Sequence, residues 1–173
     1  MKMWLPLAIA LGLSATPALA ALKAGASATD FTTQAVLGGK PFQFSLADAL
    51  KKGPVVLYFY PKAFTAGCTV EAHEFAEATA AFNQMGATVI GISADSIKTL
   101  SRFSVSECRN KFAVAVGSPA VIKAYNARLP IMGGSNRTTY VIAPGGKIIW
   151  TWSALGVKGH VAGALAAVKA WRG

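Results

Sequence analysis

The sequence predicts an α/β protein, a three-layer sandwich in which helices cover a mixed β-sheet. Two observations lead to this class. Residues 54–60, PVVLYFY, form a continuous apolar run, as expected for a strand that is buried on both faces. From Cys68 onward the apolar residues recur with the period of an α-helix, and strand and helix patterns then alternate along the chain.

The first half of the chain contains a hairpin, a buried strand and a long helix. Residues 31–50, FTTQAVLGGKPFQFSLADAL, are typical of two strands joined by a turn at Gly38 and Gly39, followed by a short helix. The long helix follows the strand at 54–60 and ends at Gly86. One face of this helix carries Cys68, Ala72, Phe75, Ala78 and Phe82. Its glutamates, Glu71, Glu74 and Glu77, are predicted to lie mostly away from that apolar face.

The second half repeats the alternation. Residues 87–95, ATVIGISAD, indicate a second buried strand, and Asp95 or Ser96 can cap a helix that runs toward Cys108. The remaining predicted elements are a short strand at 112–116, a short helix at 120–127, a hairpin at 138–152 that turns at 144–146, and a helix at 160–171.

The first residues resemble an export signal. Lys2 provides a short positive start, an apolar run follows, and residues 16–20, TPALA, end in a small-x-small cleavage pattern. The apolar run is shorter than the roughly 20 residues of a spanning helix, so a cleaved signal peptide at 1–20 is favoured over a membrane anchor. We therefore expect one exported domain at 21–173 without stable membrane insertion, located in the periplasm of a Gram-negative cell.

The charge is basic but dispersed. Seventeen Lys and Arg residues stand against seven Asp and Glu, giving a net charge of +10. The basic residues form no cluster, so the pattern does not indicate nucleic-acid binding. The excess charge weakly favours acidic protein partners or anionic membrane surfaces.

Two cysteines, Cys68 and Cys108, would face an oxidising compartment after export. They can form either a static structural disulfide or a redox pair that cycles. The only histidines, His73 and His160, lack the spacing of a zinc site relative to the cysteines, so we predict no metal. No Gly-rich phosphate loop follows a strand, and the sequence has no signature for haem, flavin or nicotinamide, so no cofactor is expected.

Cys68 lies at the start of the long helix, where backbone N–H groups without helical partners stabilise a thiolate. Gly67 leaves the backbone accessible, Pro61 can shield the sulfur from water, and Thr65 supplies a hydroxyl that both donates and accepts. This set suits a small molecule with two adjacent oxygens. Attack of the thiolate on a peroxide would give a sulfenic acid, with which a second thiol can condense to a disulfide.

Residues 61–72, PKAFTAGCTVEA, resemble the Pro-x-x-x-Thr-x-x-Cys motif of the peroxiredoxins. The continuation at 67–72 is similar to the subfamily called bacterioferritin comigratory protein, or Q-type. Residues 89–103 and 136–148 extend the resemblance over the whole mature chain. The resemblance implies a thioredoxin-like sandwich with a mixed central sheet and an N-terminal hairpin extension.

The resemblance also implies roles for individual residues. Cys68 would be the peroxidatic nucleophile, Thr65 would hydrogen-bond the peroxide, and Pro61 would shield the sulfur. Arg137 matches the family arginine at the start of the late strand and would stabilise both the thiolate and the leaving oxygen. Glu71 matches a position one turn into the helix, from which a carboxylate can orient the arginine.

The sequence departs from the family pattern at two places. Many members carry a resolving cysteine at the position of His73, which we interpret as a surface residue here. Others place it on the following helix, so Cys108 becomes the candidate resolving thiol, and two intervening elements imply that local unwinding accompanies disulfide formation. The acidic motif expected after the third helix is replaced by AVGSPA at 115–120.

The resulting expectation is a thiol peroxidase that reduces hydrogen peroxide and organic hydroperoxides and is recycled by a thioredoxin-like dithiol, as a monomer or weak dimer. One alternative is an exported disulfide oxidoreductase of the same fold. That class uses Cys-x-x-Cys, but Thr65 and Glu71 occupy the positions three residues from Cys68. Another alternative is a non-catalytic binding module with a structural disulfide, in which replacing Cys68 lowers stability and abolishes no activity.

Overall fold

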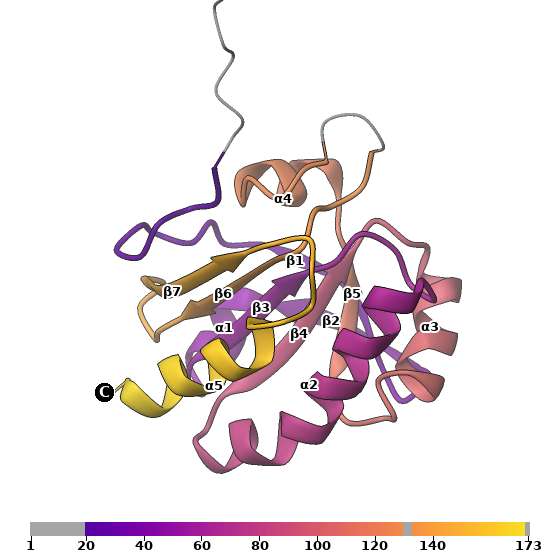
Figure 1. Cartoon of the computed structure of the whole chain (residues 1–173), viewed down its shortest axis with the longest axis horizontal. Coiled ribbons are helices and arrows are strands. Elements are labelled where there is room, and N and C mark those ends of the chain that lie inside the picture. Colours follow the sequence, from indigo (N-terminus) through magenta and orange to yellow (C-terminus); the bar gives the residue numbers. More distant parts are fainter. Residues whose placement is uncertain (1–19, 130–132, 172–173) are drawn as a thin grey trace, which may run out of the picture.

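A computed structural model describes residues 20–129 and 133–171, so nearly all of the predicted signal peptide lies outside the described residues. One seven-stranded sheet, in the order β2-β1-β5-β4-β3-β6-β7, forms the centre of the molecule (Figure 1). The strands are β1 (Thr32–Leu37), β2 (Lys40–Ser45), β3 (Val55–Phe59), β4 (Thr88–Ser93), β5 (Ala113–Val116), β6 (Thr138–Ile142) and β7 (Ile148–Ser153). Strands β3, β4 and β5 are parallel, whereas β1, β2, β6 and β7 pair in antiparallel fashion.

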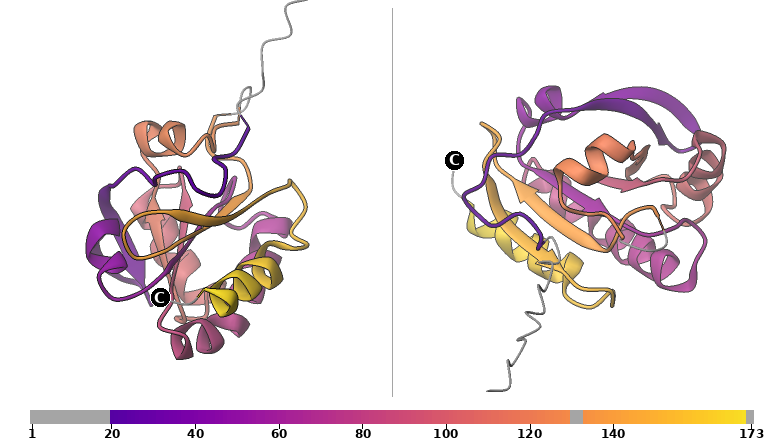
Figure 2. Two further views of the ribbon diagram at one scale, coloured as in Figure 1. Left: turned by 90° about the vertical axis from the view of Figure 1, so that its left-hand side faces the viewer. Right: turned by 90° about the horizontal axis from the view of Figure 1, so that it is seen from above.

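Five helices cover the sheet. They are α1 (Leu46–Leu50), α2 (Ala66–Gln84), α3 (Ile97–Ser106), α4 (Pro119–Ala124) and α5 (His160–Ala170). Helices α2, α3 and α5 contribute to the apolar cluster on one face, and α1 and α4 contribute to the cluster on the other. Figure 2 shows α2 and α5 opposite α1 across the sheet. This arrangement confirms the predicted thioredoxin-like three-layer sandwich, including the N-terminal hairpin that extends its sheet.

The apolar run at 54–60 forms the centre of the sheet, as predicted. Every residue of β3 is buried, because β4 and β6 pair with its edges and helices cover both faces. The hairpin turn at Gly38 and Gly39 is also confirmed. Both glycines have positive φ values, 56° and 77°, which other residues rarely adopt.

Helix α2 differs from the prediction in two respects. It begins at Ala66 with Thr65 at its N-cap, so Cys68 is the third helical residue. Glu71 is completely buried, although its position in the pattern predicted a location away from the apolar face. The reason is that α5 packs against α2 and covers a second stripe of it.

Ser96, and not Asp95, caps α3 and accepts a hydrogen bond from the Thr99 N–H.

Strand register brings four segments to one edge of the sheet. Phe59 at the end of β3 lies opposite Ile92 of the parallel β4 and opposite Thr138 of the antiparallel β6. Thr138 in turn pairs with Ser153 at the end of β7. The chain after β3, after β4, before β6 and after β7 therefore meets at this edge, as is usual for binding crevices at the carboxyl ends of parallel strands.

A helix that crosses a membrane must be both long and apolar. Within 20–129 and 133–171, no helix is both long enough and apolar enough to cross a bilayer.

Candidate active site

Cys68 lies in the first turn of α2 and is only 2% exposed. The Thr69 N–H donates to the Thr65 carbonyl across 2.9 Å, which starts the helical ladder. The preceding N–H groups of the helix have no acceptor within it, and their partial positive charges surround the base of the Cys68 side chain. The sequence placed the thiol at a helix start, and the structure adds that the sulfur is almost fully screened from bulk water.

Arg137 connects Cys68 to two further groups. Its Nη2 atom donates to the Cys68 Sγ atom at 3.5 Å, and its Nη1 atom donates to Oε2 of Glu71. Its Nε atom donates to the Leu155 carbonyl at 2.8 Å. The planar guanidinium is thus fixed in three directions while being only 5% exposed. Burial disfavours its charge, but the charges of Glu71 and Cys68 outweigh burial and raise the pKa of Arg137.

Glu71 is the counter-ion of this cation. Burial raises the pKa of the Glu71 carboxyl from 4.5 to about 7, and the Arg137 guanidinium opposes that rise. Its Oε1 atom accepts no hydrogen bond, and the Nδ1 atom of His160 lies 3.7 Å away. Glu71 therefore holds Arg137 with one oxygen and faces a histidine with the other.

Gly67 makes room for the arginine. A Cβ atom at this position would lie 3.1 Å from Nη2 of Arg137, closer than the usual separation of such atoms. Glycine has a lower helical propensity than other residues, but at this position the missing side chain leaves room for the guanidinium to reach the sulfur of Cys68.

Thr65 and Pro61 belong to the loop between β3 and α2. The Thr65 hydroxyl donates to the Lys62 carbonyl at 2.9 Å and the residue is exposed, so the hydroxyl oxygen can still accept a hydrogen bond. Pro61 follows the buried end of β3 and is partly buried. The structure thus places Thr65 at the N-cap of the helix that carries Cys68, and Pro61 at the start of the loop that leads to it.

Two polar residues that were not predicted to belong to the site hold this loop. Asp95 accepts from the Ala63 N–H at 2.7 Å and from the Ser93 hydroxyl at 2.8 Å. Ser135 donates to the Tyr60 carbonyl at 2.6 Å. A signal for Asp95 was present, because a polar residue after a buried parallel strand lies at the edge where sites form.

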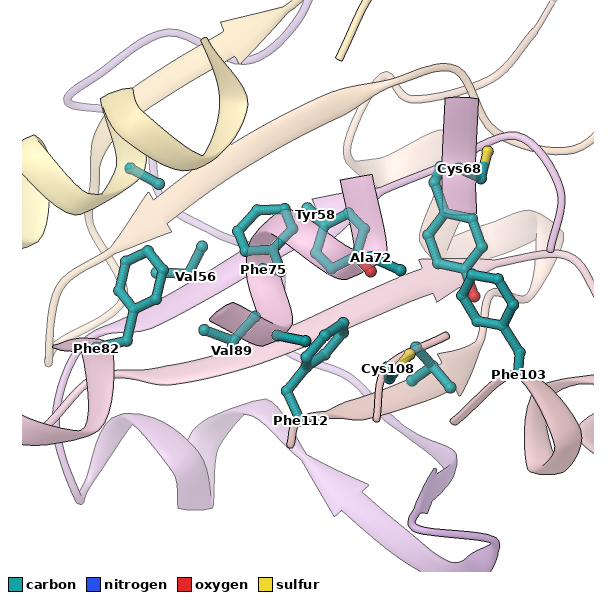
Figure 3. Close-up of a cluster of buried hydrophobic side chains, with 14 of the residues drawn as sticks. Val56, Tyr58, Cys68, Ala72, Phe75, Phe82, Val89, Phe103, Cys108 and Phe112 are labelled. Carbon is teal, nitrogen blue, oxygen red and sulfur yellow. The ribbon is translucent and has the colours of Figure 1, made fainter. Parts of the chain in front are cut away.

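Cys108 lies two residues beyond α3 and is completely buried. It belongs to the apolar cluster beneath α2 (Figure 3), where burial raises the pKa of its thiol. In this view the sulfur of Cys68 points out of the cluster, while the side chain of Cys108 lies within it. Both cysteines are free thiols in the structure.

His73 is not a simple surface residue. Its side chain is 34% exposed, and its Nε2 atom lies 2.9 Å from Oε2 of Glu107. A second pair, Arg109 with Glu77, joins the same two regions at 3.2 Å. The segment that carries Cys108 is therefore tied to α2 by the Arg109–Glu77 ion pair and by the contact between His73 and Glu107.

In the part of the chain that the structure describes, no three His, Cys, Asp or Glu side chains are grouped to hold a metal ion.

Comparison with known proteins places this geometry in a family. Residues 24–151 match the model of the AhpC/TSA family. The chain is 34% identical over 122 residues to Peroxiredoxin Bcp of Xanthomonas campestris pv. campestris, covering 67% of this chain and 76% of that protein. It is 33% identical to Peroxiredoxin Bcp of Bacillus subtilis, covering 66% and 77% respectively.

A solved structure of a related protein has the same fold. Peroxidoxin BcpB from Mycobacterium tuberculosis superimposes with a TM-score of 0.78 at 30% identity, covering 88% of this chain and 99% of that chain. The chain therefore belongs to the AhpC/TSA family and is a peroxiredoxin, that is, a thiol peroxidase.

Proposed function

We propose that this peroxiredoxin reduces hydrogen peroxide and organic hydroperoxides through a sulfenic acid on Cys68. The observation that carries the proposal is the 3.5 Å contact between Nη2 of Arg137 and Sγ of Cys68. The thiolate is the nucleophilic form of a cysteine, and in this structure a fixed cation lies beside the sulfur that would carry that charge. The same cation faces the negative charge that develops on the leaving oxygen.

The first step conserves atoms and charge. The Cys68 thiolate attacks the hydroxyl oxygen of the peroxide, so an S–O bond forms as the O–O bond breaks. The other oxygen leaves as hydroxide or alkoxide and takes a proton to become water or an alcohol. Arg137 stabilises the transition state, Thr65 accepts a hydrogen bond from the peroxide, and Pro61 limits water at the sulfur. Glu71 keeps the guanidinium in place.

Cys108 is proposed as the resolving thiol. Its sulfur would condense with the Cys68 sulfenic acid, forming a disulfide and releasing water. Because Cys108 is buried and lies past α3, the turn at 107–111 has to open before the two sulfurs meet. This turn contains Arg109 and Asn110 with φ values of 51° and 57°, a conformation that asparagine tolerates but that is unfavourable for arginine.

A thioredoxin-like dithiol would then reduce the disulfide by thiol–disulfide exchange.

We also propose that the chain is exported to the periplasm after cleavage following Ala20, and that it acts as a monomer or weak dimer. Fractionation of cells that express the full chain, with mass spectrometry of its N-terminus, tests export. An uncleaved N-terminus in the cytoplasmic fraction would contradict it.

The activity is tested by peroxide consumption in the presence of a thioredoxin system. Cys68→Ser is expected to abolish turnover. Cys108→Ser is expected to lose turnover with the dithiol protein but to retain it with a small-thiol reductant. Equal activity of wild type and Cys68→Ser would overturn the proposal and favour a binding module with a structural disulfide. Transfer of a disulfide to a client protein without peroxide consumption would instead indicate an oxidoreductase.

A further inference from the structure

His160 is completely buried at the first position of α5, close to the active site. No part of the peroxide chemistry described above requires it. Its ring nevertheless makes two hydrogen-bond contacts, with the Thr139 hydroxyl at Nδ1 across 2.8 Å and with the Ala154 carbonyl at Nε2 across 3.1 Å. A histidine held at both nitrogens beside a catalytic arginine has a defined orientation and tautomer.

The contacts determine the tautomer. A backbone carbonyl only accepts, so the Nε2 atom of His160 carries the proton and donates to Ala154. In the neutral ring, Nδ1 then has a lone pair and accepts from the Thr139 hydroxyl. The same Nδ1 atom lies 3.7 Å from Oε1 of Glu71, the carboxylate oxygen without a hydrogen-bond partner among the described residues.

Two consecutive residues, Ala154 and Leu155, connect the ring of His160 to Arg137 by hydrogen bonds. Ala154 accepts from His160 through its carbonyl and donates its N–H to the Arg137 carbonyl at 3.2 Å. The next residue, Leu155, accepts from Nε of Arg137 at 2.8 Å. The position of the carbonyl that orients the guanidinium is thus determined by the bond from His160 one residue earlier.

We propose that neutral His160 is a positioning residue for the Arg137 guanidinium, acting through the Ala154–Leu155 backbone. The rate prediction rests on the proposed function, because it concerns the reaction of Cys68 with peroxide.

Three features keep the ring uncharged. Burial lowers the pKa of His160, and the nearby charge of Arg137 lowers it further, although its backbone contacts oppose this. The start of α5 also disfavours a cation. The titratable and charged groups around the ring are Glu71 of α2 and Arg137 before β6, and Thr139 of β6 supplies a neutral hydroxyl.

Protonation of His160 would change the contacts of its neighbours. A proton on Nδ1 would displace the hydroxyl proton of Thr139 and would attract Oε1 of Glu71. The new cation would repel Arg137, while Glu71, whose pKa is about 7, would carry little negative charge at the pH where the ring takes up its proton. The guanidinium would lose part of its hold beside Cys68, so protonation of His160 should slow the peroxide reaction in acid.

The test compares two isosteric variants in a single-turnover oxidation of Cys68. The amide nitrogen of Gln reaches the place of Nε2, so His160→Gln keeps the donor to Ala154 and cannot become charged. Asn reaches only the place of Nδ1, so His160→Asn loses that donor. We expect His160→Gln to stay near the wild-type rate at neutral pH and His160→Asn to fall about tenfold, as for loss of one hydrogen bond.

A pH series adds a readout that a purely structural role would not change. The rate of His160→Gln relative to wild type should rise as the pH falls, because only the wild type gains the second cation. His73→Gln serves as the control, since it removes the chain's other histidine and should give a constant ratio in this first step. The rate of Cys68 alkylation, followed by peptide mass spectrometry, gives the same comparison without peroxide.

The outcomes separate the two proposals. If wild type does not consume peroxide, the proposed function fails, and the alkylation series still decides the role of His160. If both variants match wild type at every pH, the positioning role is wrong. Should the variants not fold, NMR of the ring nitrogens in wild type decides, because an Nδ1–H tautomer or a charged ring at neutral pH would overturn the inference.

Discussion

Nη2 of Arg137 donates to Sγ of Cys68 across 3.5 Å, although the residues are 69 positions apart in the chain. The contact exists because Arg137 immediately precedes β6, whose first residue lies opposite the last residue of β3. Cys68 follows β3 after a short loop. The two residues are therefore brought together by strand register, and Gly67 leaves the space through which they meet.

Arg137→Lys should lower the rate of peroxide reduction by about a hundredfold, as for the loss of an oriented donor in a transition state. Lysine keeps the charge, but its single ammonium cannot bind Glu71, the Leu155 carbonyl and the sulfur in the same planar arrangement. Steady-state peroxide consumption measures the effect. Arg128→Lys, at an exposed side chain, is the matched control, and equal losses in both variants would show that the orientation of Arg137 is unimportant.

Gly67→Ala should stabilise the fold and weaken catalysis. Gly67 has an ordinary helical backbone, so alanine should raise the free energy of unfolding by up to about 1 kcal/mol through helix propensity. The added methyl would lie 3.1 Å from Nη2 of Arg137 and should push the guanidinium away from the sulfur. Denaturant unfolding and peroxide turnover test the two effects. A variant with unchanged turnover would mean that Arg137 shifts without consequence.

Glu71→Gln should change how stability depends on pH. The folded pKa of Glu71, about 7, is above its ordinary value of 4.5, so its contribution to stability is present below pH 4.5 and is lost as the pH rises through 7. Glutamine does not titrate. The unfolding free energy of the variant minus that of wild type should therefore rise across this window, by at most on the order of 3 kcal/mol.

His160 acts in the opposite direction, since its folded pKa is lowered from 6.5 and its contribution is lost as the pH falls. It is present in both proteins, but it lies 3.7 Å from Glu71, so its contribution cancels only in part in the difference. Glu74→Gln, an exposed change of the same type on α2, should give a difference that hardly varies with pH. A flat difference for Glu71→Gln as well would show that the buried carboxyl does not titrate near neutrality.

Glu107→Gln should accelerate formation of the proposed Cys68–Cys108 disulfide. The charge of Glu107 pairs with His73 at 2.9 Å and ties the Cys108 segment to α2. Because the pair is partly exposed, losing it should lower the unfolding free energy by less than about 1 kcal/mol, while local opening becomes easier. Quenched reactions with stoichiometric peroxide, resolved by mass spectrometry, measure the disulfide. Rates that match wild type and Glu74→Gln would argue that another contact limits opening.

The sequence alone predicted the fold class, which the structure confirms, and it provided the proposal that Cys68 is the nucleophile. Periodicity marked β3 and α2, two glycines marked the first hairpin turn, and the residues around Cys68 carried the peroxiredoxin resemblance. These features are local, because they depend on residues within one or two elements. The roles of Thr65 and Pro61 remain predictions, although both occupy the loop where that resemblance put them.

Only the tertiary structure decided which distant groups surround the sulfur. Glu71 looked exposed by its own helix pattern and became buried because α5 covers it. Asp95 looked like a helix cap and instead holds the loop before Cys68, and His160 carried no local signal at all. Such contacts depend on strand register and on the packing of one helix against another. A single sequence does not encode them in any periodic pattern, so they follow only once the sheet is assembled.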